Sequence, residues 1–413
     1  MALAGVRFVS APETALPILA VALGGGLLGV ASGLTPGLHA NNFAMVMAAA
    51  ASEVPVPPLV LATGMLTAGV VHTVLDAVPA LALGVPDASM AMTALPGHRL
   101  VIAGQGREAL RLSALGSGLA LAFSLLLALP TTWLMKRAYP SISSHLPLVL
   151  AAVVLGLFAT ESSNRGRIVG SILFAASTAL GVATLDLSLS APLGQGSALT
   201  PLFAGLFGAP VLIDALDGGG VPPQGSPAVT SSPWVVILTA LAGACAGAAV
   251  GYLPGVSSAI AAVLALTVLP SSGGDRGYVV ATSGVNTANS VFALWALVAL
   301  GSPHTGVLVA VDRIGAPPNV PVLLSAVLLG GAVGLVAMVA VGDRYLDFVR
   351  QVRYERISVG VCGLLVGLSY LFAGVLGIGI FVASTALGLV PVRLMARRVY
   401  LMGVLIGPLM LPI

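Results

Sequence analysis

The chain has 413 residues, of which 58% are hydrophobic and only 8% are charged, whereas an ordinary soluble domain carries roughly 25% charged residues. This composition excludes a soluble enzyme, and it excludes a receptor with a large domain outside the membrane. The 17 Lys+Arg and 14 Asp+Glu residues give a net charge of +3, and because they are scattered through short segments rather than gathered in a basic face, no nucleic-acid partner is predicted.

Long apolar runs predict an all-α polytopic membrane protein. At about 20 residues per crossing, a chain of this length has room for roughly ten to twelve transmembrane segments. No charged leader with a cleavage site precedes the first run, so we expect that run to be a retained helix. Several of the predicted spans are short of a full crossing, and in chain order they are Leu16–Leu34, Leu59–Val85, Leu112–Leu134, Leu146–Thr160, Ile168–Leu185, Leu199–Ile213, Trp234–Tyr252, Val279–Leu300, Val320–Val341, Ile357–Phe372, Val375–Val392 and Val399–Leu411.

Two further apolar stretches, Asn41–Ala51 and Ser257–Leu269, are about half the length of a crossing. Each follows a Pro-Gly pair, Pro36-Gly37 in the first case and Pro254-Gly255 in the second. A continuous helix does not tolerate such a pair well, because proline removes a backbone hydrogen bond and clashes with the preceding turn. We therefore expect a re-entrant or broken helix at each Pro-Gly turn.

The two halves of the chain resemble each other around these turns. The run Gly25, Gly29 and Gly33 precedes the first turn with the spacing that Gly243, Gly247 and Gly251 have before the second, at an offset of 218 residues. Nearly the same offset, 217, places His72-Thr73 on Asn289-Ser290.

The longest polar stretch lies between the two halves. We therefore predict a first transmembrane repeat over residues 1–213, a linker loop over 214–233 and a second repeat over 234–413. A duplicated unit with a broken helix in each copy is typical of secondary transporters whose site lies near the membrane midplane. The sequence leaves open whether the repeats are inverted or parallel.

The first Pro-Gly turn is a candidate anion site. Backbone freed at the turn exposes N–H groups at the start of the next half-helix, where the positive end of the helix dipole favours a negative charge. Three strongly polar side chains follow within four positions, although Thr35 and the asparagines could instead only cap the half-helix. The substrate-binding residues predicted here are Thr35, Pro36, Gly37, His39, Asn41 and Asn42.

The second half contributes smaller polar groups to the predicted site. At its turn we predict substrate contacts from Pro254, Gly255, Ser257 and Ser258, and this asymmetry suggests one ligand bound between unequal halves. Within the following span, polar residues recur on one stretch of helix, and these either line the substrate cavity or hold helices together. The residues predicted there are Asn286, Asn289 and Ser290.

Two ionisable residues, His72 and Asp76, lie four positions apart inside a predicted span and so share one helix face. Ionisable groups within the membrane are costly and by default mark ion or substrate paths. We predict that they couple transport to Na+ or H+, with a structural hydrogen-bonded pair as the alternative. No metal site, cofactor or catalytic residue is predicted, because the chain has no metal-ligand spacing, Walker loop or nucleophile elbow.

These residues resemble a known family, the large membrane subunit of tripartite tricarboxylate transporters (the TctA family) in its archaeal version. The resemblance covers most of the chain and is carried by both Pro-Gly turns, by Pro96-Gly97-His98-Arg99-Leu100 with the following Gly104 to Leu110, and by Ala288-Asn289-Ser290. It implies a multi-pass carrier of the cell membrane for citrate-like carboxylates, driven by an ion gradient. In bacteria such a subunit works with a small membrane subunit and an extracytoplasmic binding protein. The family's Glu is Asn286 here, so the substrate and the coupling ion stay open.

The alternative function is translocation of a polyprenyl phosphate or another lipid phosphate. Carriers of that kind also use paired Pro-Gly turns followed by small polar residues, similar to Pro254-Gly255-Val256-Ser257-Ser258, and a phosphate suits a helix N-terminus as well as a carboxylate does. A tricarboxylate should require cationic partners, and in the predicted site only His39 and His72 could be cations. A membrane scaffold without transport activity would lack polar clusters beside the broken helices. We therefore expect a small organic anion and the lipid bilayer as partners.

Overall fold

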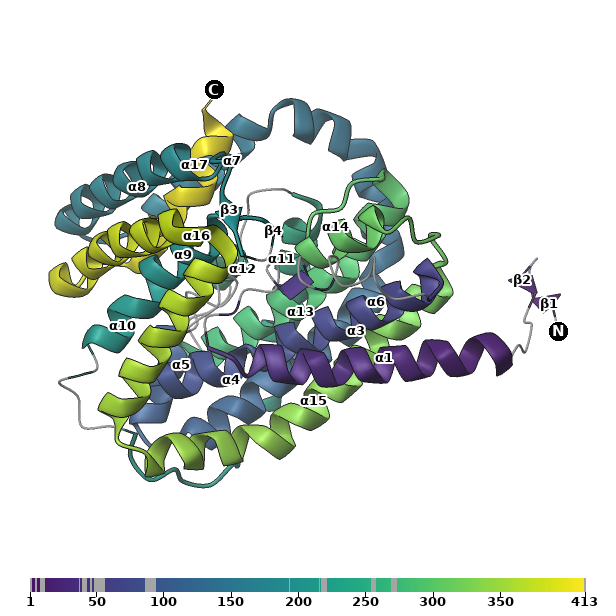
Figure 1. The fold of residues 1–413 in the computed structure, drawn as a ribbon, viewed down its shortest axis with the longest axis horizontal. Coiled ribbons are helices and arrows are strands. Elements are labelled where there is room, and N and C mark those ends of the chain that lie inside the picture. The colour runs from purple at the N-terminus through teal and green to yellow at the C-terminus, as the bar shows by residue number, and fades with distance from the viewer. Residues whose placement is uncertain are drawn as a thin grey trace.

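The fold of this chain, seen in a computed structural model, is almost entirely helical (Figure 1). The structure describes residues 2–3, 6–7, 12–36, 38, 43–44, 47, 56–85, 94–192, 194–214, 216, 221–253, 258–268 and 273–411. The helices are α1 (Pro12–Gly33), α3 (Pro58–Leu75), α4 (Ala77–Leu83), α5 (Ala94–Ile102), α6 (Gly106–Ser144), α7 (Leu146–Ala159), α8 (Asn164–Thr184), α9 (Leu199–Phe203), η2 (Ala204–Gly208), α10 (Ala209–Asp214), α11 (Pro233–Tyr252), α12 (Ser258–Val268), α13 (Gly274–Leu300), α14 (Gly306–Arg313), α15 (Val320–Gln351), α16 (Tyr354–Leu394), η4 (Arg398–Met402) and α17 (Gly403–Met410). Two antiparallel pairs of two-residue strands complete the fold, β1 (Ala2–Leu3) with β2 (Val6–Arg7) and β3 (Ser190–Ala191) with β4 (Gly194–Gln195).

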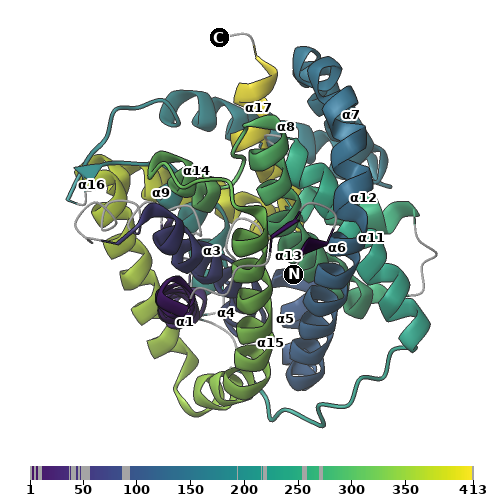
Figure 2. The same ribbon diagram turned by 90° about the vertical axis from the view of Figure 1, so that its right-hand side faces the viewer.

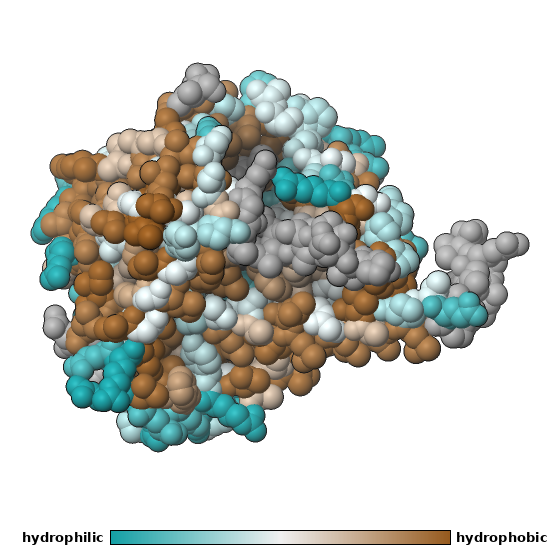
Figure 3. All heavy atoms as spheres, in the orientation of Figure 1, coloured by the Kyte–Doolittle hydropathy of each residue, from teal (hydrophilic) through white to brown (hydrophobic). Residues whose placement is uncertain are grey.

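The predicted all-α membrane architecture is confirmed. Within the described residues, eight helices are long and apolar enough to cross a membrane, and three shorter apolar helices cover Leu146–Ala159, Leu199–Asp214 and Arg398–Met410. Each predicted span lies within one of these helices or extends past its end by one or two residues, and α16 covers two of them. Apolar side chains cover much of the face shown in Figure 3, and hydrophilic residues gather in patches mostly near its rim.

The structure describes the second of the two predicted half-length helices but only a few residues of the first. The second begins as expected, because α12 starts at Ser258 and runs for 11 residues. Most of Asn41–Ala51 lies outside the described residues, and the exceptions are Phe43, Ala44 and Met47.

The α16 helix is kinked at Gly374, whose φ of 64° and ψ of −159° lie outside the helical region. Only glycine adopts this conformation without strain. A Cβ at this position would also collide with the carbonyl oxygen of Ser190. The break falls between the predicted spans Ile357–Phe372 and Val375–Val392, so α16 is two helical arms joined at one residue.

Small residues bring α1 and α3 into close contact. A Cβ at Gly29 would lie 2.5 Å from the carbonyl oxygen of Ala68, and one at Gly25 would collide with the backbone of Gly64. Residue numbers rise together along the two helices at these contacts, so α1 and α3 run parallel.

The α11 and α13 helices pack in the same manner. A Cβ at Gly243 would lie 2.7 Å from the carbonyl oxygen of Ala281, and one at Gly247 would lie 2.9 Å from that of Val285. From the first contact to the second, the residue numbers rise along both helices, so α11 and α13 also run parallel.

The direction of α3 relative to α13 follows from the helices between them. Thr67 of α3 donates to the carbonyl oxygen of Ala326 on α15 at 3.1 Å, and Gly334 packs on Val74 seven to eight residues later, so α3 and α15 are parallel. The α6 helix runs against α15, because Gly331 of α15 packs on Leu121 of α6 while the later Gly342 packs on the earlier Leu110. Since Gly116 and Ala120 of α6 pack on Val280 and Gly284 of α13, α6 and α13 are parallel. It follows that α3 and α13 are antiparallel.

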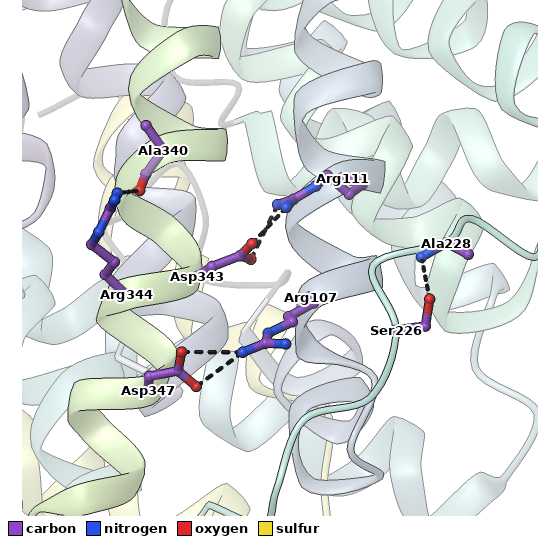
Figure 4. A network of polar contacts seen from close by, with 8 residues as sticks. All are labelled: Arg107, Arg111, Ser226, Ala228, Ala340, Asp343, Arg344 and Asp347. Atoms are coloured by element: carbon purple, nitrogen blue, oxygen red, sulfur yellow. Dashed lines mark hydrogen bonds and ion pairs between the residues drawn. The ribbon is translucent and has the colours of Figure 1, made fainter.

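Ion pairs tie α6 to α15 at one end of this bundle (Figure 4). Arg111 donates to both carboxylate oxygens of Asp343 at 3.1 and 2.6 Å, and Arg107 donates to both oxygens of Asp347 at 3.2 and 3.1 Å. Arg111 uses two nitrogens on two oxygens, the bidentate geometry that is the strongest form of an arginine–carboxylate contact. Arg107 reaches both oxygens of Asp347 through Nη2 alone. The pairs fix the N-terminal turns of α6 against the C-terminal turns of α15.

The segment between α10 and α11 lies across the same end of the bundle, where Figure 2 shows it as a teal trace at the bottom of the view. Residues 221–232 form no helix or strand. Gln224 accepts from the backbone N–H of Gly106 at 2.6 Å and donates to the carbonyl oxygen of Val101 at 3.0 Å. Thr230 donates to Glu108 from its backbone N–H at 2.8 Å. This stretch of the predicted linker is therefore fastened to the start of α6.

Candidate functional site

A buried polar contact joins the two antiparallel helices α3 and α13. Asp76 lies in the turn between α3 and α4 and is 3% exposed, and Asn286 on α13 is 2% exposed. The Asn286 side-chain amide donates to the Asp76 carboxylate at 3.1 Å and to the carbonyl oxygen of Thr73 at 3.0 Å. Both amide hydrogens are thus used, which holds Asn286 in one orientation toward the carboxylate.

His72 lies one helical turn before Asp76 and is fully buried. Its Nδ1 is 3.0 Å from the hydroxyl oxygen of Ser32 at the end of α1, and that hydroxyl lies 3.2 Å from the carbonyl oxygen of Gly29, to which it donates. Because Ser32 has only one hydroxyl proton, Nδ1 of His72 is then the donor in their contact. In the neutral ring this leaves the lone pair on Nε2. The ring of Phe43 stacks on it, with centroids 6.0 Å apart.

The contact between Asp76 and Asn286 lies well inside the membrane-length helices. Asp76 comes seven residues before the end of α4, and Asn286 comes twelve residues after the start of α13. At 1.5 Å per residue, Asp76 lies about 10 Å before the end of α4 and Asn286 lies about 18 Å after the start of α13. Since α3 and α13 are antiparallel, both depths are measured from the same end of the bundle. A carboxylate at this depth is costly to leave charged, which makes Asp76 a candidate for an ion or substrate path.

Two further polar atoms of α13 lie beside this contact in the chain. The hydroxyl of Thr287 and the side-chain carbonyl oxygen of Asn289 are buried, and neither has a hydrogen-bond partner in the part of the chain that the structure describes. Asn289 and Ser290 are otherwise half-buried. Buried polar atoms without partners are rare, so this stretch of α13 has capacity for a ligand or an ion.

The structure places some of the predicted site residues and not others. Thr35 is half-buried at the end of α1, and its hydroxyl donates to the carbonyl oxygen of Ala31 at 2.8 Å, so it serves its own helix. Pro36 follows it in the turn, and Ser258 is buried at the start of α12. The predicted residues that lie outside the described part of the chain are Gly37, His39, Asn41, Asn42, Pro254, Gly255 and Ser257.

Two groups that the sequence treats separately are brought together. The predicted ion-coupling residue Asp76 and the predicted substrate residue Asn286 share a hydrogen bond. Sequence reasoning missed Ser32 and the backbone oxygen of Thr73, which position His72 and Asn286. Ser32 could have been found, because after Thr14 it is the only hydroxyl in the apolar, Gly-rich α1.

Two comparisons with known proteins match nearly the whole chain. The family described as "Tripartite tricarboxylate transporter TctA family" matches residues 19–403. The chain is 26% identical over 399 residues to the uncharacterized protein MJ1079 of Methanocaldococcus jannaschii, a match that covers 94% of this chain and 96% of that protein. No solved structure matches.

Proposed function

The chain belongs to the tripartite tricarboxylate transporter TctA family, and from this premise we propose that it is the permease subunit that moves a small organic anion, a di- or tricarboxylate, across the cell membrane. The family is one of transporter components rather than enzymes, and the chain is a multi-pass membrane protein. The observation that carries the proposal is the buried contact of Asp76 and Asn286 between antiparallel helices.

An ion gradient drives this transport through His72 and Asp76. The carboxylate of Asp76 accepts a hydrogen bond from a neutral amide, and a buried carboxylate gains stability when it takes up a proton or a cation. His72, fully buried one helical turn before Asp76, is the second ionisable group in this coupling. Both Na+ and H+ are consistent with these groups, and the test below separates them.

The cargo binds where two inverted repeats meet. The α1 and α3 helices pack through glycines as α11 and α13 do, and the two pairs run in opposite directions. This supports a division into repeats over residues 1–213 and 234–413, joined by the loop 214–233, with the site at their interface as in other secondary transporters. The Pro-Gly turns of both halves contribute the remaining substrate contacts.

The end of the bundle at which α6 and α13 begin faces the cytoplasm. Basic residues near the ends of membrane helices gather on the cytoplasmic side. The arginines at this end are Arg99, Arg107, Arg111, Arg276, Arg344, Arg350, Arg353 and Arg356, whereas the C-terminal part of α6 carries Lys136 and Arg137 and the far end of α14 carries Arg313.

Two partner subunits complete the transporter. By its family membership the chain works with a small membrane subunit and with an extracytoplasmic binding protein that delivers the anion. Family membership gives no support to the alternative of lipid-phosphate translocation, and no contact among the described residues favours it.

Uptake by reconstituted protein tests the proposal. Purified protein in liposomes is given labelled citrate or a labelled dicarboxylate, with an inward gradient of Na+ or of H+ imposed separately. We expect accumulation under one gradient and its loss in Asp76→Asn. Asp186→Asn, at an exposed position in the loop after α8, is the matched control and should keep wild-type uptake. If no carboxylate accumulates under either gradient, with or without the partner subunits, the proposed function is wrong.

A further inference from the structure

The helices of this chain pack into two groups, and each group takes elements from both halves of the sequence. The first group, which we call the bundle, comprises α1, α3, α4, α5, α6 and α11 to α15. The second, which we call the flanking group, comprises α7, α8, α9, η2, α10, α16, η4 and α17. Figure 1 shows α8, α10 and α16 of the flanking group toward the left and α1, α3 and α15 of the bundle toward the right.

Polar contacts between its own helices hold the bundle together. Its ion pairs are Arg99–Asp275, Arg107–Asp347, Arg111–Asp343 and Arg276–Glu108. The hydroxyl oxygens of Ser113 on α6 and Ser283 on α13 lie 2.8 Å apart. His72, Asp76 and Asn286 belong to helices or turns of the bundle, so the whole candidate site lies within this one group.

The flanking group has polar contacts of its own. Thr178 of α8 donates to the carbonyl oxygen of Gly403 on α17 at 3.2 Å, and the Arg397 guanidinium beside η4 donates to Thr160 at the end of α7 at 2.6 Å. In the part of the chain that the structure describes, no ion pair crosses from one group to the other. Each group is therefore braced internally by polar contacts.

The contacts between the two groups involve apolar side chains. At three places a glycine of one group faces a methyl group of the other. The pairs are Gly156 with Leu264 at 3.5 Å, Gly208 with Val85 at 3.4 Å and Gly84 with Val211 at 2.9 Å, each measured to the methyl carbon from the position of a Cβ on the glycine. They join α7 to α12, and η2 and α10 to the end of α4.

The glycines inside each group face the backbone instead. A Cβ on Gly243 of the bundle would lie 2.7 Å from the carbonyl oxygen of Ala281, and one on Gly205 of the flanking group would lie 2.6 Å from that of Phe381. Backbones packed this closely resist sliding, whereas apolar contacts between side chains have no preferred direction. Packed helices joined by such contacts can slide past one another in a shear motion.

We propose that transport moves the bundle as one body along the flanking group, and that this movement carries the Asp76–Asn286 contact and its cargo across the membrane. The inference rests on the proposed function. It assigns the moving bodies to the two packing groups rather than to the two sequence repeats, because the contacts that brace each group join helices of both halves. The helix-to-helix crossings of the chain between the groups, at His145 and at Val352, have backbone angles outside the helical region and serve as hinges.

The test joins the two groups covalently and measures uptake. The cysteines Cys245 and Cys362 are first replaced by serine. Gly156→Cys with Leu264→Cys then places one thiol on each group. In liposomes, Hg2+ joins two adjacent thiolates, and dithiothreitol releases it. We expect Hg2+ to reduce citrate uptake about tenfold or more, because uptake requires the movement, and dithiothreitol to restore it. Citrate binding should stay within about twofold of wild type.

A pair inside the bundle is the matched control. A Cβ on Gly118 of α6 would lie 3.3 Å from a methyl carbon of Leu335 on α15, and all four positions in the two pairs are half-buried. Gly118→Cys with Leu335→Cys should keep its uptake after Hg2+ treatment. Uptake before treatment shows that each variant is folded, and Gly208→Cys with Val85→Cys replaces the first pair if that pair fails to fold.

Two results would overturn the inference. Wild-type uptake in protein whose bundle and flanking group are bridged would show that the two groups need not move. Loss of uptake in the bridged control would show that α6 and α15 move against each other, so that the bundle is not one body.

Failure of the proposed function is distinguishable from failure of this inference. Wild-type protein that neither binds nor transports any carboxylate contradicts the proposed function, and distances between spin labels then decide the movement without cargo. Labels at Leu126 and Ile172, which are 75% and 63% exposed, report across the groups, and labels at Leu126 and Val336 report within the bundle. We expect two distances across the groups and one within the bundle. One distance in both pairs would overturn the inference.

Discussion

Replacing Glu108 by glutamine should destabilise the fold far more than the same change at an exposed glutamate. One carboxylate oxygen of Glu108 accepts from the backbone N–H and the hydroxyl of Thr230 at 2.8 and 2.7 Å, and from Nε of Arg276 at 2.9 Å. The other accepts from Nη2 of Arg276 at 3.0 Å. Glu108→Gln keeps the shape of the side chain but removes its charge and turns one acceptor into a donor that faces the guanidinium.

The expected loss of stability follows from the burial of the pair. Breaking a fully buried ion pair by removing one partner costs about 3–5 kcal/mol. The Glu108 side chain is only 4% exposed, but that of Arg276 is 29% exposed, and water can solvate it in part. We therefore expect a loss of about 2–3 kcal/mol for Glu108→Gln. At roughly 2 °C per kcal/mol for a large domain, the unfolding temperature should fall by about 5 °C.

The assay is thermal unfolding of the purified protein in detergent, with Glu355→Gln as the control. Glu355 pairs with Arg353 at 2.7 Å, and the two side chains are 58% and 66% exposed. An exposed pair contributes about 0–1 kcal/mol, so the control should unfold near the wild-type temperature. Adding Arg276→Met to Glu108→Gln should recover part of the loss, because the stranded charge is gone. Equal shifts for Glu108→Gln and Glu355→Gln would refute the reasoning.

Three further predictions concern stability in the same assay. Gly247→Val should prevent α11 from packing on α13 and reduce the yield of folded protein, whereas Gly360→Val, which meets nothing within 4 Å, should not; equal yields would contradict the close packing. Gly374→Ala should disrupt the fold of α16, since its φ is positive, and Gly379→Ala should be tolerated. Burial lowers the pKa of His304 below its usual 6.5, so the unfolded state binds more protons and the free energy of unfolding falls as the pH drops below about 6.5. His304→Gln should flatten this fall. An unchanged slope would show that His304 does not cause it.

Much of the fold could be predicted from the sequence because the membrane imposes simple length and polarity limits. The break between Ile357–Phe372 and Val375–Val392 is a local property of Gly374, so it was visible from the sequence. The extension of α6 beyond Leu134 was not, because Lys136 and Arg137 read as the end of a span. The structure continues the helix, and the guanidinium of Arg137 lies 3.7 Å from the ring centroid of Trp133.

Contacts between distant parts of the chain were beyond the sequence. Arg107 and Arg111 are four residues apart, as are Asp343 and Asp347, which predicts that each pair shares a helix face. Nothing in that spacing says that the two faces meet. The same holds for Asp76 and Asn286, whose residue types suggested function but whose hydrogen bond depends on the antiparallel packing of α3 and α13. The burial of Arg398 was hidden for the same reason, since burial of an arginine near a helix end is decided by tertiary packing.

The ion pairs between α6 and α15 can form only after both helices have been synthesised. Arg107 and Asp347 are 240 residues apart in the chain. At a synthesis rate of 5–20 residues per second, the ribosome needs about 12–48 s to make α15 after α6. Until α15 is made, α6 can pack on the helices that precede α15, among them α11 and α13, but Arg107 and Arg111 lack their carboxylate partners. The two ion pairs are therefore among the last contacts to form, and a chain stalled before α15 would lack them.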